Sequence, residues 1–435
     1  MQILNSNQGR RSLPGPWSKG RSSPAIRGGL LFANFFLIIL AFYHLKPASR
    51  SLFIESLGAD ELPQVWIGVA FAMVVVIAFY NRLVERVDRL RVVLGSLLLF
   101  AGLLVVFRVL LAKPTKEVTV CLYIFVDVLG VVLVEQFWSL TNSIYNTREG
   151  KRWYGFVGTG GLVGGVAGGG EAAMLIRWTP MQTPDLLLAG AAILMLIFVL
   201  TWVMARLGLY QETHPSVKTE TAAGDWRALR HNRYLLLIAA VLLLAQAASP
   251  LVEFQFLKSV EGVYSDLDAR TAFLSMFFSL MGIISIGVNL GLTPVIHRRL
   301  GVIAGLLVQP MMMSLCSGGF WAYPTLFTAA ATKISDRGLS YSINRASKEL
   351  LYVPLDPVLI YQAKAWIDMC GYRIFKVFGS LLILLFTHWL PVKWGFTQLS
   401  WVTLGLCGIW MWIILILRRY YLRISEKPLE EPKLP

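Results

Sequence analysis

The chain has 435 residues, of which 56% are hydrophobic and only 15% are charged, and it carries a formal net charge of +15. Soluble domains contain about 25% charged residues, so this composition excludes an ordinary soluble protein and indicates a membrane protein. The four cysteines lie singly in apolar segments, which argues against a zinc site, a redox pair and a structural disulfide.

Apolar windows of about 20 residues, the length that a helix needs to cross a bilayer, recur twelve times along the chain. They cover 29–47, 64–81, 92–112, 118–146, 154–176, 185–207, 233–258, 271–296, 300–319, 321–350, 361–389 and 396–417. The sequence therefore predicts an all-α membrane protein with twelve transmembrane helices.

Lys and Arg in the connections orient these windows. They gather in the tail before the first window, after the second, fourth and eighth windows, and in the tail after the last. The connection after the first window is acidic instead, with Glu55, Asp60 and Glu61. Because short cytoplasmic loops accumulate Lys and Arg, we expect an inner-membrane protein with both termini in the cytoplasm.

The positive net charge is thus mainly a sign of topology. A nucleic-acid-binding surface is the competing interpretation, but it would gather basic residues on one face. Here they are dispersed among short connections. The expected partners are the lipid bilayer and a small anionic molecule, with no nucleic acid, and we expect a monomer.

A polar segment of about Leu209–Arg233 separates the first six windows from the last six. We expect a tail over 1–28, a six-helix half over 29–208, a cytoplasmic linker over 209–232, a second six-helix half over 233–417 and a tail over 418–435. Two six-helix halves joined by a cytoplasmic linker resemble the plan of the major facilitator superfamily. In that plan the first, fourth, seventh and tenth helices line a central cavity.

Charged side chains inside the windows point to function, because each costs about 2.5–3.5 kcal/mol at the centre of a bilayer. They lie in the first, fourth, seventh, tenth and eleventh windows. They are Lys46, Arg50, Asp127, Glu135, Glu253, Lys333, Asp336, Arg337, Arg345, Asp368, Arg373 and Lys376. Since bases outnumber acids, we expect a cavity for an anion, which Arg binds well as phosphate or carboxylate. The alternative for any single residue is an internal salt bridge that holds helices together.

Helical spacing groups several of these residues. Asp127, Glu135, Trp138 and Asn142 are spaced to share one face of the fourth window. Glycines crowd residues 155–170 of the fifth window, but no Gly-Lys-Ser/Thr follows them, which argues against a phosphate-binding loop. We expect these glycines to let helices pack closely. The five histidines are far apart, and no nucleophile–base set stands out, so we expect neither an enzyme nor a cofactor.

One stretch is more specific than composition. Ser347–Asp356 (SKELLYVPLD), followed by Ala363–Asp368 (AKAWID) and Lys376, resembles the signature of the ATP/ADP translocases of plastids and intracellular bacteria. Glu135–Trp138 (EQFW) through Asn142, and then Lys151–Gly155 (KRWYG), resembles a second segment of that family. Leu251–Glu253 with Lys258 resembles its seventh helix. These pieces occur in the family's order over nearly the whole chain.

The resemblance implies a carrier of the major facilitator type that exchanges nucleotides by alternating access. It implies that Lys46, Glu135, Glu253 and Lys376 take part in substrate binding or translocation. Combined with the charge pattern, it gives a larger expected substrate-binding set. This set is Lys46, Arg50, Glu135, Trp138, Asn142, Glu253, Arg337, Arg345, Asp368, Arg373 and Lys376.

Specific roles are expected within this set. Trp138 or the nearby Tyr43 would stack on an aromatic ring, and Glu135 and Glu253 would pair with bases in the empty carrier. A carboxylate is alternatively the carrier of a coupling proton. The chain departs from the family where Ser51, and not an acid, follows Arg50. Residues 358–361 also replace a charged stretch, so the substrate need not be ATP.

Two other functions remain open at this point. One is a permease for a different solute, such as a siderophore, a drug, a peptide-like or a lipid-like molecule, which a cavity lined by Phe and Met more than by Arg would favour. The other is a membrane sensor or assembly factor that transports nothing. It predicts that solute flux is absent although cavity variants still have a phenotype.

Overall fold

A computed structural model describes residues 24–145, 147–210, 232–352, 367, 371–391 and 393–425. The described chain before residue 211 forms six long helices and two short 3-10 turns. They are α1 (Pro24–Leu57), η1 (Ala59–Glu61), α2 (Leu62–Arg86), α3 (Arg89–Leu110), α4 (Lys116–Ile144), α5 (Thr147–Trp178), η2 (Thr183–Asp185) and α6 (Leu186–Arg206). We call α1 to α6 the N-terminal helices.

The described chain after residue 231 is also helical, and π-helical turns interrupt two of its helices and end a third. Its elements are α8 (Arg233–Val263), α9 (Leu267–Gly287), η3 (Val288–Leu292), α10 (Thr293–Arg299), α11 (Gly301–Ala322), α12 (Leu326–Leu339), η4 (Ser340–Asn344), α13 (Arg345–Tyr352), α15 (Tyr372–Leu384), η6 (Leu385–Trp389) and α16 (Leu399–Ser425). We call α8 to α16 the C-terminal helices. No strand occurs in the part of the chain that the structure describes.

Short polar side chains begin several of these helices by accepting hydrogen bonds from free backbone N–H groups. Asn232 accepts from the N–H groups of Tyr234 and Leu235 at the start of α8. Asp266 accepts from the N–H of Ala269 at 2.7 Å at the start of α9. These caps fix where the chain enters the bundle from each connection.

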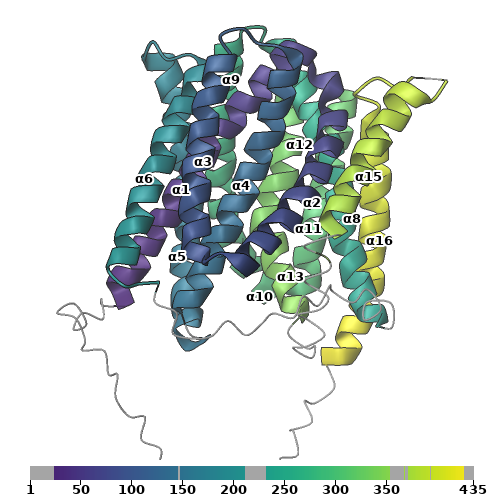
Figure 1. The fold of residues 1–435 in the computed structure, drawn as a ribbon. Helices are drawn as coiled ribbons and strands as arrows, with labels where there is room; N and C mark the ends of the chain where they lie inside the picture. Colours follow the sequence, from purple (N-terminus) through teal and green to yellow (C-terminus); the bar gives the residue numbers. More distant parts are fainter. Residues whose placement is uncertain are drawn as a thin grey trace, which may run out of the picture.

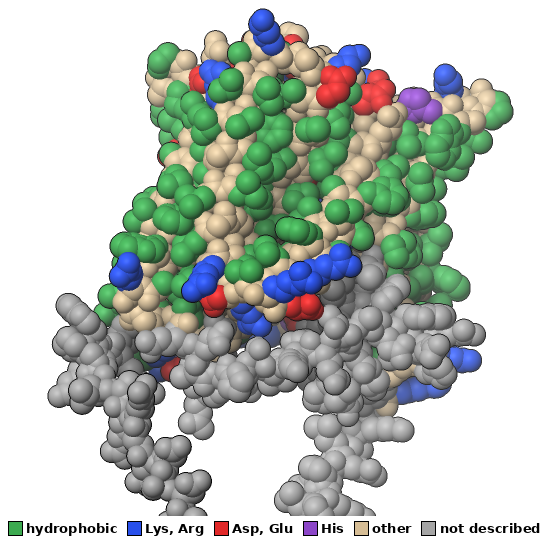
Figure 2. Space-filling view, viewed as in Figure 1, with side chains coloured by type: hydrophobic (Ala, Val, Ile, Leu, Met, Phe, Trp, Pro, Cys, Tyr) green, Lys and Arg blue, Asp and Glu red, His purple; other side chains and the backbone are tan. Residues whose placement is uncertain are grey.

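The helices run side by side in one bundle (Figure 1), and hydrophobic side chains cover the middle of the face drawn in Figure 2, between an upper and a lower level of charged side chains. Within the described residues, nine helical stretches are long and apolar enough to cross a membrane. They coincide with nine of the twelve windows that the sequence predicts. The protein is therefore an integral membrane protein.

The other three windows are those over 154–176, 321–350 and 361–389. The first lies in α5, which has 32 residues but is rich in glycine. The second is divided among α12, η4 and α13, and the third falls partly outside the described residues.

The packing of the N-terminal helices has a counterpart among the C-terminal helices. Helix α1 packs against α4, α5 and α6, as α8 packs against α12, α15 and α16. Likewise, α3 packs on α6 as α11 packs on α16. The two sets meet where α5 contacts α9 and where α2 contacts α15.

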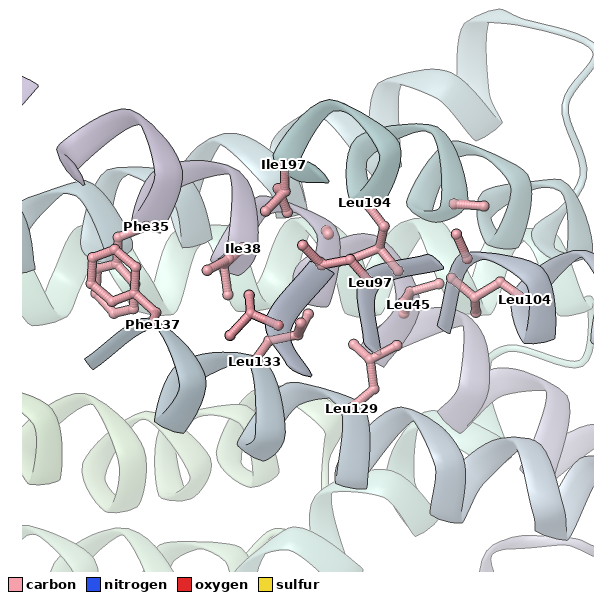
Figure 3. Packing of buried hydrophobic residues seen from close by; sticks show 14 of the residues in the cluster. Phe35, Ile38, Leu45, Leu97, Leu104, Leu129, Leu133, Phe137, Leu194 and Ile197 are labelled. Carbon is pink, nitrogen blue, oxygen red and sulfur yellow. The ribbon is translucent and has the colours of Figure 1, made fainter. Parts of the chain in front are cut away.

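Buried aliphatic and aromatic side chains fill the space among the N-terminal helices. In Figure 3, Phe35 of α1 lies against Phe137 of α4, and their rings stack with centroids 4.7 Å apart. Leu97 of α3 and Leu194 of α6 extend the same cluster. Lipid tails are as apolar as these side chains, so close packing contributes more here than exclusion from water.

Glycine lets α5 approach α1 closely, as the sequence predicts. A Cβ atom added at Gly160 would lie 2.6 Å from the carbonyl oxygen of Phe32, and one at Gly168 would lie 2.7 Å from that of Leu40. A Cβ at Gly169 would lie 2.6 Å from the carbonyl oxygen of Ser275, on α9. The glycines of α5 therefore serve packing both within the N-terminal helices and against the C-terminal helices.

Candidate functional site

A cavity of about 270 Å³ lies in the middle of the bundle, between the N-terminal and the C-terminal helices. Helices α1, α2, α4, α8, α12, η4 and α15 contribute its walls. The lining residues are Phe42, Lys46, Arg50, Trp66, Val69, Met73, Asp127, Val131, Gln246, Ser249, Pro250, Glu253, Arg337, Tyr341 and Lys376. This site contains five of the eleven residues that the sequence predicts for substrate binding.

Proline lies inside two of the helices that line the cavity. Pro47 lies inside α1 beside Lys46, and Pro250 lies inside α8 beside Ser249. Each proline removes one intrahelical hydrogen bond, because it has no N–H group. A membrane helix tolerates this where neighbouring helices or a polar cavity satisfy the freed carbonyl.

Arg50 and Asp127 form an ion pair across the N-terminal wall of the cavity. One guanidinium nitrogen of Arg50 lies 2.6 Å from a carboxylate oxygen of Asp127. The guanidinium carbon is also 4.6 Å from the ring centre of Tyr123, within the range of a cation–π interaction. Arg50 is thus positioned by its own set of helices.

Glu253 and Lys333 form an ion pair in the C-terminal wall. The ammonium group of Lys333 also lies 3.1 Å from Asp336, and the hydroxyl of Ser249 donates to the same carboxylate at 2.8 Å. The side chain of Lys333 is only 1% exposed, so it joins α8 to α12 from behind the cavity wall. This cluster matches the alternative in which an intramembrane charge holds helices together. Arg337 keeps a looser contact with Asp336, at 3.7 Å.

Lys46 and Lys376 differ from these paired residues. Within the described part of the chain, neither lysine has a carboxylate within 4 Å. Lys46 lies near aromatic rings instead, with its ammonium nitrogen 4.8 Å from the centre of the Phe278 ring and 5.7 Å from that of Phe42. Lys46 comes from α1 and Lys376 from α15, so the two cations reach one cavity from the two sets of helices.

Bases therefore dominate the cavity. Four basic side chains and two carboxylates line it. Positively charged side chains in a cleft with low-dielectric walls raise the local concentration of anionic ligands. The arrangement suits an anion that is held between Lys46 and Lys376. Among the described residues, no cluster of His, Cys, Asp and Glu is suited to a metal ion.

Other predicted site residues lie away from the cavity lining. Trp138 packs edge-on against Phe35 and Tyr154, and Asn142 accepts a hydrogen bond from the Tyr154 hydroxyl at 2.8 Å. Glu135 is exposed on α4, more than two turns from Asp127.

Three predicted residues come from the later helices. Arg345 is exposed at the start of α13, and Arg373 is partly buried on α15. Neither lines the cavity. Asp368 lies outside the described residues.

Ten of the fifteen described lining residues were missing from the predicted set, among them Asp127, Trp66 and Tyr341. Asp127 had been recognised as an intramembrane charge but not as a site residue. Trp66 is buried, and its indole N–H donates to the Tyr123 hydroxyl at 2.7 Å. Tyr341 follows Arg337 by four residues, and this helical spacing was a signal that could have found it.

Polar contacts join the two sets of helices at the end of the bundle where α1 terminates. Lys258 of α8 pairs with Asp60 at 2.8 Å. Arg270 of α9 pairs with Glu55 at 3.0 Å and donates to the carbonyl oxygen of Ser51 at 3.3 Å. This end lies at the top of Figure 1, whereas α1 begins and α16 finishes at the lower end. The upper end of the cavity is therefore closed by contacts between the two sets.

The sequence of the chain is similar to those of known transporter families. Residues 31–347 match the Major Facilitator Superfamily, and residues 323–421 match the TLC ATP/ADP transporter family. The chain is 22% identical over 359 residues to ADP,ATP carrier protein 3 of Rickettsia felis, covering 70% of each chain. It is 24% identical over 306 residues to ADP,ATP carrier protein 1 of Chlamydia muridarum, covering 60% of this chain and 57% of that protein.

Solved structures show the same fold at low identity. A mutant of the nucleoside transporter NupG superposes with a TM-score of 0.68 at 13% identity, covering 90% of this chain and 99% of the other. A bacterial homologue of the iron transporter ferroportin, in an inward-facing state, gives 0.60 at 13% identity, covering 93% and 100%. All of these similar proteins are transporters, so the prediction of a transporter and not an enzyme is confirmed. The chain belongs to the Major Facilitator Superfamily, and its predicted resemblance to the ATP/ADP transporters is confirmed.

Proposed function

We propose that the protein exchanges nucleotides of the ATP/ADP type across the inner membrane by alternating access of the central cavity. One observation carries this proposal: Lys46 and Lys376 enter the same cavity from opposite sets of helices, and no described carboxylate lies within 4 Å of either. A phosphate chain is an anion that both ammonium groups can contact together. The ADP,ATP carriers among its relatives favour a nucleotide over other anions.

Residues 29–208 and 233–417 are proposed to be the two six-helix halves, with 1–28 and 418–435 as cytoplasmic tails and 209–232 as a cytoplasmic linker. The matching packing of α1 and α8, each against three partners, supports this division. Twelve membrane crossings would place both ends on one side, in agreement with the lower positions of the start of α1 and the end of α16 in Figure 1. The basic connections make that side the cytoplasm.

The cavity would then be closed toward the periplasm. Its closing contacts are those of Lys258 with Asp60 and of Arg270 with Glu55. Transport requires these contacts to separate while others form near the cytoplasm. The protein would work as a monomer, because one chain supplies both walls of the cavity.

Exchange, as opposed to one-way transport, follows from the two lysines. We infer that closing an empty cavity would confine Lys46 and Lys376 to a smaller volume without an anion between them. Two like charges 4 Å apart repel by about 4 kcal/mol at an effective dielectric constant of 20, and that energy slows a step by roughly a thousandfold. A bound phosphate chain removes this repulsion, so the loaded carrier would reorient much faster than the empty one.

The composition of the cavity disfavours the alternative of an amphiphilic solute. Among the described lining residues, only Phe42 and Met73 represent Phe and Met, against four basic side chains. A non-transporting sensor would still need a ligand for this cavity, and it predicts no flux.

The experiment is uptake by the purified protein in liposomes. Labelled ATP should enter liposomes loaded with ADP far faster than empty liposomes. Unlabelled ADP should compete, whereas an uncharged nucleoside should not. Absence of ATP uptake by a folded sample, or equal uptake with and without internal ADP, would reject nucleotide exchange.

A further inference from the structure

Three aromatic residues are found among the described residues that line the cavity, namely Phe42, Trp66 and Tyr341. Trp66 is 3% exposed, and its indole N–H is already bonded to Tyr123, so its ring is part of the core. Phe42 is partly buried, with Lys46 near its ring and Gly130 against its edge. Tyr341 is 49% exposed. Of the three rings, it is therefore the one with a large surface open to a ligand.

Tyr341 is exposed at a point where the regular α-helix is interrupted. It lies in η4, a five-residue π-helical turn between α12 and α13. The next three residues, Ser342, Ile343 and Asn344, are all buried, so the turn points a single aromatic side chain away from the core. Such turns interrupt helices at an energetic cost and occur frequently at functional sites.

Arg337 stands beside this ring. It precedes Tyr341 by four residues, and its guanidinium carbon is 6.0 Å from the ring centre. Both side chains line the cavity. Asp336 is 3.7 Å from the Arg337 side chain, beyond a short hydrogen bond, so this guanidinium keeps donors for a ligand. A cation and an exposed aromatic ring are thus presented side by side.

We propose that Tyr341 is the residue that selects for a nucleobase, by stacking on its planar ring while Arg337 and the two lysines contact the phosphates. The inference rests on the proposed function and extends it, because the basic residues alone would accept any phosphate anion. An aromatic face attracts every base, since every base has a π surface. Tyr341 therefore separates nucleotides from phosphates that lack a base, and it discriminates little among bases.

The two rings that the sequence favours for stacking have other contacts. Trp138 packs against Phe35, Phe137 and Tyr154. Tyr43 meets Phe278 edge-on, with ring centres 6.4 Å apart. Neither side chain lines the cavity, so Tyr341 is the described ring best placed to stack on a base.

The test compares two ligands that share phosphates and differ in the base. Affinities of the purified protein for ADP and for inorganic pyrophosphate are measured by calorimetry on the wild type, Tyr341→Leu and Tyr341→Phe. Loss of one stacking partner weakens nucleic-acid binding by about 5- to 150-fold per base. Tyr341→Leu should therefore weaken ADP binding by at least about fivefold and leave pyrophosphate binding unchanged. Tyr341→Phe should bind both ligands as the wild type does.

Tyr323→Leu is the matched control, because Tyr323 is 74% exposed in the connection between α11 and α12, away from the cavity. Gel filtration and a melting curve establish that each variant is folded. Equal weakening of ADP and pyrophosphate binding by Tyr341→Leu, or no change in either, would overturn the stacking role and leave the proposed function intact. A wild-type protein that binds neither ligand would overturn both.

Discussion

Two kinds of charged residue lie in or directly behind the walls of the central cavity, and their partners distinguish them. Arg50 with Asp127, and Lys333 with Glu253 and Asp336, are satisfied by their own helices. Lys46 and Lys376 have no such partner among the described residues. The paired residues set the shape of the two walls, and we assign the attraction for an anion to the two lysines.

Lys333→Met is expected to destabilise the protein strongly. It would leave the carboxylates of Glu253 and Asp336 in a nearly dry site without their cation, and breaking a buried ion pair in this way costs about 3–5 kcal/mol. Thermal unfolding in detergent measures the effect. Adding Glu253→Gln to Lys333→Met should recover part of the loss, because one of the two uncompensated charges is removed.

A matched control for this prediction is Lys113→Met, since Lys113 is exposed in the connection before α4. An Lys333→Met protein that melts like this control would show that the buried pair adds no stability. It would contradict the assignment of Lys333 to a structural ion pair.

The sequence identified five charged positions of the cavity but not their pairing, and it also predicted Glu135, Arg345 and Arg373, which do not line the cavity. Lys46, Arg50, Glu253, Arg337 and Lys376 were predicted at the cavity, and the structure places all five there. Which acid neutralises which base depends on how helices far apart in the chain pack together. A single sequence without that packing leaves the choice between ion pair and binding residue open.

At the scale of elements, glycine determines how closely α5 can lie against α1. Gly164 faces the backbone of α1 at Phe36, whereas Gly158 on the same helix has open space where a Cβ would be. Gly164→Ala should therefore destabilise the protein by about 1–3 kcal/mol through overpacking. Gly158→Ala should leave it unchanged or slightly more stable, because Ala favours a helix over Gly. Melting temperatures of the two variants should move apart, and equal shifts would contradict the close contact.

Elements also close one end of the cavity, and Arg270 is central to that closure. Its side chain is 4% exposed and bonds to Glu55 and to the carbonyl oxygen of Ser51 on α1. Arg270→Gln removes the charge from this contact, so we expect the population open to the periplasm to rise about tenfold or more, which corresponds to about 1.4 kcal/mol.

The measurement is the labelling rate of Ser249→Cys by a maleimide that does not cross the membrane, in a background without the four native cysteines. Ser249 lines the cavity, so it is reached from outside only when the periplasmic end opens. Arg108→Gln is the control, because Arg108 pairs with Asp185 within the N-terminal helices, at 2.7 Å. Equal labelling rates for the Arg270 and Arg108 variants would contradict the closing role.

The presence of long apolar helices followed from the sequence better than their irregularities did. Nine predicted windows coincide with long apolar helices, because length and apolar composition determine that property. The π-helical turn that exposes Tyr341 was not predicted. A hydropathy profile does not detect the single extra residue of a π-helical turn. The turn also depends on packing against neighbouring helices.

For the whole molecule, the two sets of helices supply complementary halves of one binding site. In each set, a basic side chain pairs with the carboxylate that the set places in the cavity wall. Each set also contributes at least one lysine to the cavity. In the proposed mechanism, an anion is the link that allows the two sets to close over the cavity. Composition and loop charge alone indicated a membrane carrier for an anion. The nucleotide came from family resemblance, because the shape of a binding cavity cannot be calculated from spacing within helices.

The most direct test of this account is exchange by a protein that lacks one of the two lysines. Uptake of labelled ATP into ADP-loaded liposomes is measured for the wild type, for Lys376→Ala and for the control Lys113→Ala. We expect uptake by the wild type and by the control, and a loss of at least a hundredfold in Lys376→Ala, whose cavity lacks one of the two cations that hold the phosphates. Uptake by Lys376→Ala at the wild-type rate, with the same dependence on internal ADP, would contradict the central role of the paired lysines.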